Sequence, residues 1–101
     1  MSILRYERMM SQRQLNIVGH KLRDLRIKRG YTLARLAAKC GVLGWDVTGG
    51  TLAKIETRQR SAYDCELYIL KKALSAETDD LFPERIGKEI LIECLNKPAR
   101  R

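Results

Sequence analysis

Aromatic residues are scarce in this chain of 101 residues, which has one Trp, one Phe and four Tyr. Runs of β-branched residues are also few, and the two shortages together argue against a β-sandwich or a β-barrel. A second core would leave neither half of so short a chain with enough apolar surface to bury. We therefore expect a single all-α domain.

Cysteine and histidine are sparse as well. Cys40, Cys65 and Cys94 are widely spaced and form no Cys-x-x-Cys pair, and His20 is the one histidine. This set fits neither a disulfide framework nor a zinc site, so we expect small buried cysteines, no metal and no cofactor. No apolar run approaches the roughly 18 to 20 residues of a membrane span, and the first residues lack the apolar segment of a signal peptide. We expect a cytoplasmic protein with no membrane partner.

Basic residues, in contrast, are abundant and lie mostly in the first part of the chain. The net charge is +8, to which residues 1–30 contribute +6, residues 31–60 contribute +3 and residues 61–101 contribute −1. A basic first part of the chain and a near-neutral last part favour one anionic partner, bound on one side of the molecule. The alternative is an ordinary solvated surface, which would spread its charge more evenly.

The spacing of apolar residues predicts two helices after an N-terminal arm. Residues 1–16 have only a weak period and are interpreted as a basic arm, the alternative being a poorly capped helix. A helix is predicted over residues 17–29. Thr32 is a good N-cap for a second helix of about two turns, which Gly41 ends. In that helix Ala37 permits the close approach of another backbone, as a helix-turn-helix crossing requires.

Three further helices are predicted. Thr48 or Gly49 can cap a short third helix. The pair Ser61 and Asp64 resembles a capping box before a fourth helix, and Pro83 fits the first position of a last one. The predicted architecture is a five-helix bundle in three parts: the arm (1–16), a helix-turn-helix unit (17–82), and a C-terminal helix with its tail (83–101).

The order of these helices and four sequence segments resemble one family of DNA-binding proteins. The segments are LRDLRIKRGYTLARLAAKCGV (22–42), TLAKIETRQR (51–60), YILKKALS (68–75) and DDLF (79–82). They make the stretch from residue 18 to about residue 83 similar to the Cro and lambda-repressor-like helix-turn-helix family, often called XRE-type. The resemblance implies that the second helix crosses the phosphate backbone of duplex DNA and that the third lies in the major groove.

The resemblance also implies roles for individual residues. Arg26 would pair with Glu56 and fix the angle at which the third helix is presented, the alternative being two unrelated exposed charges. The implied DNA-binding residues are Thr32, Arg35, Thr48, Gly49, Gly50, Thr51 and Lys54, with Arg58 and Arg60 anchoring phosphates just beyond the helix. Since few of these side chains are strong base readers, we expect sequence discrimination to be modest, or to depend on DNA shape and the basic arm.

Two features depart from the family pattern. Leu33 stands where many relatives have a Gln that contacts phosphate, which puts that contact in doubt. The turn between the second and third helices carries about five more residues than the common form, centred on LGWDV. We expect Trp45 to pack under this turn together with Val47, the alternative being a Trp that stacks on nucleic acid.

The last predicted helix has more apolar residues than one small core can bury. Ile86, Ile90, Leu91, Cys94 and Leu95 cover more than one of its faces. We predict a homodimer through residues 83–96, because helix-turn-helix proteins commonly bind two half-sites as twofold dimers. The alternative is a helix wrapped onto its own core.

The most specific functional hypothesis is a sequence-specific, DNA-binding transcriptional regulator of bacterial or phage type, with double-stranded DNA as its partner. A second hypothesis is an antitoxin or similar inhibitor, which binds a protein and uses its helix-turn-helix to regulate its own operon. A third is a protein-binding domain that has lost DNA binding. The sequence has no acid pair, nucleophile–base set or phosphate loop, so we expect no enzymatic activity.

Overall fold

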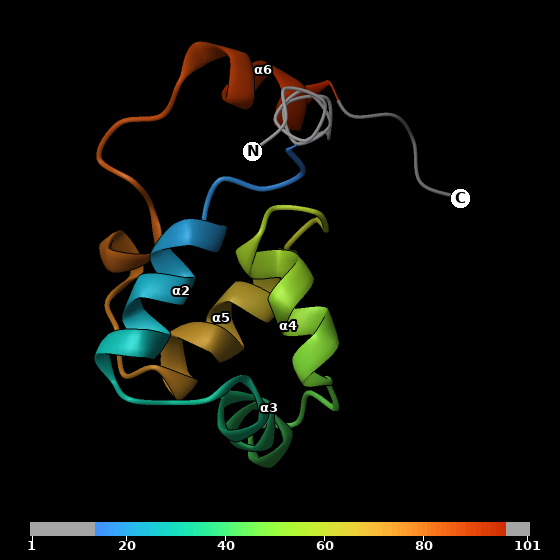
Figure 1. Ribbon diagram of the computed structural model, residues 1–101, viewed down its shortest axis with the longest axis vertical. Coiled ribbons are helices and arrows are strands. Elements are labelled where there is room, and N and C mark those ends of the chain that lie inside the picture. The colour runs from blue at the N-terminus through green and yellow to red at the C-terminus, as the bar shows by residue number, and fades with distance from the viewer. Residues whose placement is uncertain (1–13, 97–101) are drawn as a thin grey trace, which may run out of the picture.

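The computed structural model describes residues 14–96 and is all-helical over that range, with no strand. Figure 1 shows its helices, which are α2 (Gly19–Lys28), α3 (Leu33–Val42), α4 (Gly49–Glu56), α5 (Asp64–Ala73), the short 3-10 helix η1 (Thr78–Leu81) and α6 (Lys88–Leu95). The prediction of an all-α fold with five helices is confirmed. Each of these helices is too short or too polar to cross a bilayer. Most of the predicted arm, and the tail after residue 96, lie outside the described residues.

Side-chain caps determine where the helices of the middle segment begin. The Thr32 hydroxyl accepts a hydrogen bond from the Arg35 N–H at 3.0 Å, and α3 starts at the next residue. Thr48 does the same for α4, accepting from the Thr51 N–H at 3.1 Å. Both caps agree with the prediction, and each satisfies a backbone donor that a helix start leaves without a partner.

The fourth helix is capped two residues later than the sequence pattern predicts. The predicted box joined Ser61 to Asp64, whereas the N-cap is Tyr63, whose N–H donates to the Glu66 carboxylate at 3.0 Å. Asp64 is instead the first residue of α5. Glu66 is the usual residue type at the third helical position of such a box, but Tyr is not a usual N-cap, so neither the Ser61–Asp64 pair nor the Tyr63–Glu66 pair matches the motif in full.

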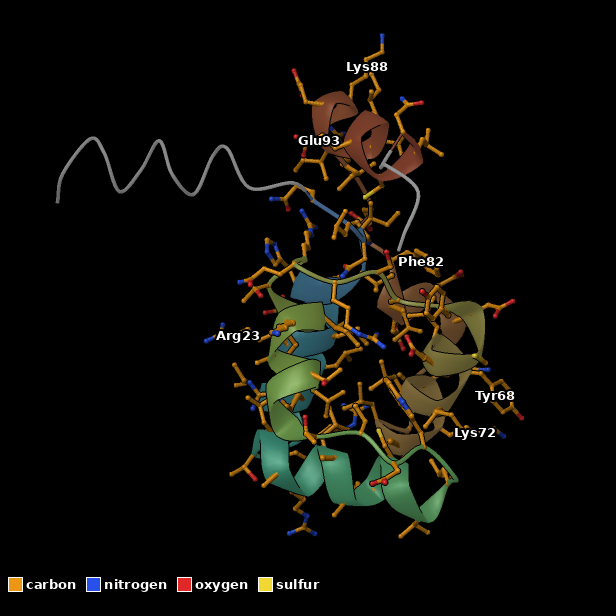
Figure 2. All side chains as sticks on the ribbon, turned by 90° about the vertical axis from the view of Figure 1, so that its right-hand side faces the viewer. Arg23, Tyr68, Lys72, Phe82, Lys88 and Glu93 are labelled. Carbon is orange, nitrogen blue, oxygen red and sulfur yellow. The ribbon has the colours of Figure 1, made fainter. Side chains whose placement is uncertain are left out.

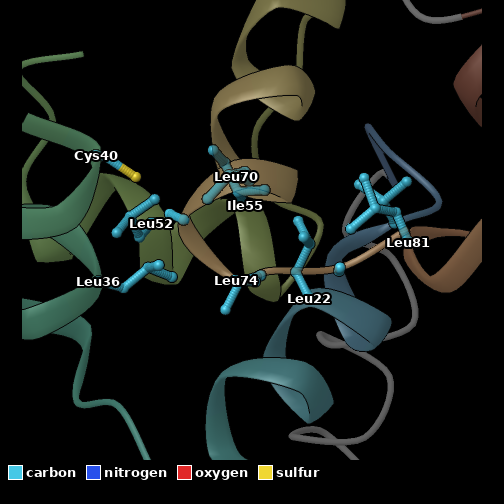
Figure 3. Close-up of a cluster of buried hydrophobic side chains, with 11 residues drawn as sticks. Leu22, Leu36, Cys40, Leu52, Ile55, Leu70, Leu74 and Leu81 are labelled. Atoms are coloured by element: carbon cyan, nitrogen blue, oxygen red, sulfur yellow. The ribbon is translucent and has the colours of Figure 1, made fainter. Parts of the chain in front are cut away.

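The core lies among α2, α3, α4, α5 and η1. Figure 3 shows its largest fully buried side chains, which are six leucines and one isoleucine: Leu22, Leu36, Leu52, Ile55, Leu70, Leu74 and Leu81. Cys40 of α3 is fully buried beside them. Burial raises the pKa of the Cys40 thiol to about 11, so this cysteine stays protonated and acts as a small apolar residue. The prediction of three buried cysteines holds only for Cys40, because Cys65 is exposed and Cys94 is half-buried.

The last helix begins later than predicted and stands apart from the bundle. α6 starts at Lys88 after the N-cap Gly87, so Pro83 and Ile86 lie in the segment before it. None of its residues is buried, and Figure 1 shows it above the first turn of α2. It is joined to the segment that leads into α2: the Gln14 N–H donates to Glu93 at 3.1 Å, and the Cys94 thiol donates to the Gln14 carbonyl at 3.3 Å.

Candidate nucleic-acid interface on α4

The first turn of α4 lies directly against the first turn of α3. A Cβ built on Gly49 would lie 3.4 Å from the Leu33 Cβ, so the two helix starts are in close contact. The long turn between the helices folds back onto the core, with the Trp45 N–H donating to the Cys40 carbonyl at 2.9 Å. Trp45 and Val47 both pack against the buried cluster, which confirms the predicted packing of Trp45 under the turn.

These two helix starts form a surface suited to an anion. The unpaired N–H groups of a helix start carry partial positive charge, and neither α3 nor α4 has an acidic residue in its first turn to offset that charge. Thr32 and Thr48 are exposed, and Thr51 is half-exposed. The structure therefore brings together Thr32 and the predicted set from Thr48 to Thr51 around one pair of facing helix starts.

The outward face of α4 carries few side chains of any size. Gly50, Lys54 and Thr57 are exposed, and their spacing places them on one side of the helix. A Cβ added at Gly50 would have only the Thr48 hydroxyl within 4 Å, at 3.8 Å. Another molecule can therefore approach the α4 backbone closely at this glycine, with Lys54 one turn further along.

A nearly buried ion pair braces the far end of α4. Arg26 donates to both Glu56 carboxylate oxygens, from Nε at 2.7 Å and from Nη2 at 3.1 Å. A third guanidinium donor, Nη1, reaches the Tyr31 carbonyl at 2.8 Å. The side chains are only 13% and 6% exposed, so the predicted pair is confirmed and its geometry is bidentate. It ties α4 to α2 and to the connection that leads into α3.

Two residues that sequence reasoning did not single out also hold α4 in place. The buried Asn16 side chain donates to the carbonyls of Ile55 (3.0 Å) and Arg60 (2.8 Å). Its oxygen accepts from the N–H groups of Val18 and Gly19, at 3.1 and 2.8 Å. One amide therefore satisfies two backbone N–H groups at the start of α2, whose N-cap is Val18, and joins this start to the end of α4. The available signal was an Asn just before a predicted helix, where Asn is a favoured cap.

Gly19 allows α2 to touch the end of α4. A Cβ at this position would lie 2.2 Å from the Ile55 carbonyl oxygen and 2.7 Å from that of Glu56. No real side chain fits at such distances, so the backbones of α2 and α4 are in direct contact here. The crossing of these two helices depends on a residue without a side chain.

Arg58 is not at the surface, which corrects its predicted role as a phosphate anchor. Its φ is 65°, a left-handed conformation that few non-glycine residues adopt, and the residue is only 6% exposed. The side chain turns inward, where Nη2 lies 3.5 Å from the Ile17 carbonyl. Burial lowers the pKa of this guanidinium. The left-handed turn after α4 could not be read from the residue type, because arginine favours neither such a turn nor burial.

Arg60 is committed to a second ion pair rather than left free for a ligand. Its guanidinium donates to both Glu66 oxygens at 2.9 and 3.0 Å, and also to the Ser61 carbonyl at 3.0 Å. Burial acts to raise the pKa of Glu66, but the hydrogen bonds from Arg60 and the Tyr63 N–H, and the charge of Arg60, outweigh it and hold that pKa below its usual value. Arg60 was one of the predicted phosphate anchors, but in the structure its guanidinium pairs with Glu66 in the first turn of α5.

Arg35 lies on a different flank of α3 from the contact with α4. It is exposed and comes two residues after Leu33, and two helical residues are separated by about 200° around the axis. Its guanidinium lies 5.4 Å from the centre of the Tyr31 ring, and the Lys39 amine lies 5.0 Å from the same ring. Arg35 therefore lies on another side of α3 than the Leu33 contact with Gly49, next to Thr32, whose hydroxyl accepts from the Arg35 N–H.

Comparison of the chain with protein-family models, with curated proteins and with solved structures gave no match. Among residues 14–96, no three His, Cys, Asp or Glu side chains lie together in a way that could hold a metal ion. The candidate interface is therefore defined by its own geometry: two facing helix starts, an open glycine and one exposed lysine.

Proposed function

We propose that this protein is a transcriptional regulator of bacterial or phage type that binds duplex DNA through α4, as the resemblance to XRE-type helix-turn-helix proteins implies. The observation that carries the proposal is the exposed first turn of α4, which is packed on α3 at one end and braced by Arg26 and Glu56 at the other. A helix held at a fixed angle, with a free outer face, meets the need of a helix that enters a major groove. The +9 charge of the first 60 residues supports an anionic partner. As a DNA-binding regulator, the protein would act in the cytoplasm.

The proposed mechanism divides the work between backbone approach and a few polar side chains. Gly50 lets the α4 backbone come close to the bases without reading them. The Thr48 and Thr51 hydroxyls are 3.2 Å apart and can meet donors or acceptors on base edges, and Lys54 can reach guanine or phosphate. With so few base readers, sequence-dependent DNA shape supplies part of the discrimination. Occupancy of a promoter then blocks or recruits the transcription machinery.

The test compares two exposed lysines on opposite sides of the bundle. Lys54→Ala removes the one lysine of the outward face of α4, and Lys72→Ala removes a lysine of α5, which Figure 2 shows on the other side of the molecule. Both variants lose one charge, so their effect on general solubility is matched. Affinity for labelled duplex DNA is measured by fluorescence anisotropy over a range of salt concentrations.

We expect Lys54→Ala to weaken binding and to reduce the slope of log K against log salt by about one, because one phosphate or base contact is lost. Lys72→Ala leaves both quantities close to those of the unmodified protein. Equal effects of the two substitutions would show that DNA is attracted by overall charge and does not contact α4.

We also propose that the protein is a homodimer through α6. Ile90 and Leu91 are half-buried, and Ile92 and Leu95 are 46% and 72% exposed, so the helix presents apolar surface that its own body does not cover. A twofold dimer would cover this surface and present two copies of α4 to two half-sites. Sedimentation at micromolar concentration tests the proposal: we expect a dimer, and a monomer for Leu95→Asp. A monomeric unmodified protein would rule it out.

The same apolar surface of α6 supports a second candidate function, that of an antitoxin or similar inhibitor. In that case α6 binds a partner protein, and the helix-turn-helix unit regulates the operon that encodes both. A toxin-like reading frame beside the gene, together with co-purification of its product, would favour this candidate over a simple regulator.

A further inference from the structure

The edge of α4 that faces α2 has no basic residue of its own. The two arginines that follow the helix are not available, because Arg58 is buried and Arg60 is paired with Glu66. Within α4 the one basic residue is Lys54. It comes two residues before Glu56, which pairs with α2, so these two side chains are about 200° apart around the helix axis. Lys54 therefore lies on the edge of the outward face that points away from α2.

The exposed Thr57 does not supply a donor there either. Its hydroxyl donates to the Ala53 carbonyl at 3.0 Å and lies 3.3 Å from the Lys54 carbonyl, so its hydrogen is committed to the backbone of its own helix. Ala53 and Gly50 have no polar side chain. A phosphate beside this edge of α4 therefore needs a donor from a neighbouring helix.

Arg23 lies on the side of α2 that contacts α4. That side is marked by Gly19, whose backbone touches the end of α4, and by Arg26, which pairs with Glu56. Arg23 is four residues after Gly19 and three before Arg26, and residues at these spacings share one face of a helix. Gly19 is buried whereas Arg23 is exposed, so Arg23 lies at the solvent edge of the contact between α2 and α4.

The guanidinium of Arg23 is not neutralised within the described part of the chain. Residues 14–96 form two ion pairs, those of Arg26 and Arg60, and Arg23 belongs to neither. Figure 2 shows Arg23 projecting from the bundle on the opposite side of the molecule from Lys72 of α5. Arg23 is thus an exposed cation beside α4, on the side of the bundle that carries the candidate interface.

A helix that enters the major groove lies between two sugar–phosphate backbones. The groove of B-DNA is about 12 Å wide, and a helix with its side chains is about 10–12 Å across. Both edges of the outward face of α4 would therefore lie close to phosphates. Lys54 is placed to reach one backbone, whereas the other backbone borders the edge that faces α2.

We propose that Arg23 binds a phosphate of the DNA strand that borders the α2 side of α4, while Lys54 faces the other strand. This inference rests on the proposed entry of α4 into the major groove, and it adds a contact from a second helix. Arg23 then takes the role that the family resemblance implied for Arg58 and Arg60. An arginine suits this role because its planar fork can donate to two phosphate oxygens at once.

The test compares Arg23→Ala with Lys28→Ala in the full-length protein. Lys28 is also exposed on α2, but it is nine residues after Gly19 and therefore about 180° around the axis from the α4 contact. Both substitutions remove one charge from the same helix, and alanine favours the helix, so both variants should fold. Affinity for labelled duplex DNA is measured by fluorescence anisotropy over a range of salt concentrations, with circular dichroism as the check on folding.

We expect Arg23→Ala to weaken binding several-fold and to lower the slope of log K against log salt by about one, because one phosphate contact is lost. Lys28→Ala should leave the slope close to that of the unmodified protein. Arg23→Lys keeps a cation at this position and should retain most of the slope. Combining Arg23→Ala with Lys54→Ala should lower the slope by about two, because the two contacts are separate.

The outcomes distinguish this inference from the proposed function. If Lys54→Ala lowers the slope but Arg23→Ala changes it no more than Lys28→Ala does, Arg23 does not contact phosphate, and the entry of α4 into the groove stands. A double variant with the same slope as Lys54→Ala alone would overturn the contact as well. If the unmodified protein does not bind duplex DNA, both proposals fail.

Discussion

Replacing Gly19 by alanine tests the contact that sets the crossing of α2 and α4. The added Cβ would lie 2.2 Å from the Ile55 carbonyl oxygen, where ordinary contact begins at 3.4 Å, so the end of α4 has to move by about 1.2 Å. Overpacking of this kind costs about 1–3 kcal/mol. The shift also strains the hydrogen bond from Asn16 to Ile55, worth about 1 kcal/mol. We expect a total loss of roughly 3 kcal/mol in the free energy of unfolding.

The assay is chemical and thermal unfolding followed by circular dichroism, with Gly41→Ala as the matched control. Gly41 is also helical, in α3, but a Cβ there meets nothing within 4 Å. Alanine at Gly41 should be neutral or stabilising by up to about 1 kcal/mol. For a domain of this size, a loss of about 3 kcal/mol at Gly19 lowers Tm by roughly 12 °C or more. If Gly19→Ala unfolds within about 2 °C of the unmodified protein, the backbone contact inferred between α2 and α4 is incorrect.

Three further substitutions probe the supports of α4 and α5. Glu56→Ala should lower the free energy of unfolding by about 3 kcal/mol because it strands the nearly buried Arg26, and a double-mutant cycle should give clearly less than additive losses. Thr48→Ala should cost about 1 kcal/mol by removing the cap of α4, measured by urea unfolding. Glu66→Gln should destabilise at neutral pH. The folded-state pKa of Glu66 lies below its unfolded value, so its contribution is present above about pH 4.5 and is lost as pH falls through the folded pKa. Unfolding curves of the Glu66 variant and the unmodified protein should therefore converge in acid, and a constant gap would contradict the assigned ion pair with Arg60.

The sequence carried enough information for the elements whose signals are local. Thr32 and Thr48 were recognisable as caps because a cap depends on the hydroxyl and on backbone groups within three residues. Arg26 and Glu56 are 30 residues apart in the sequence, so their pairing could be predicted only from the family resemblance. Periodicity alone would have left these two residues as unrelated charges.

The features that were missed depend on contacts between distant segments. Asn16 joins the start of α2 to carbonyls about 40 residues further along the chain, and no local pattern encodes that partner. The family resemblance implies the same phosphate-anchoring role for Arg58 and Arg60, yet the left-handed turn at Arg58 directs its side chain inward, and the Arg60 guanidinium pairs with Glu66. In a basic chain, the number of arginines is visible in the sequence, but their direction is set by the turns between helices.

The late start of α6 has a similar explanation. Pro83 is a favourable first residue of a helix, but the helix begins after Gly87. None of the α6 residues is fully buried, so tertiary packing constrains the start of this helix less than the starts of the core helices. The predicted helix start at residue 83 is therefore wrong, and Ile86 lies outside the helix.

Selection of bound duplexes from a random DNA library, at near-physiological salt, tests the proposed function most directly. We expect enrichment of a short inverted repeat, because two copies of α4 related by a twofold axis would read two half-sites. Loss of that enrichment in Lys54→Ala, but not in Lys72→Ala, would assign the reading to the outward face of α4. No enrichment, with binding that disappears as salt rises, would contradict sequence-specific recognition and favour a protein as the partner of this chain.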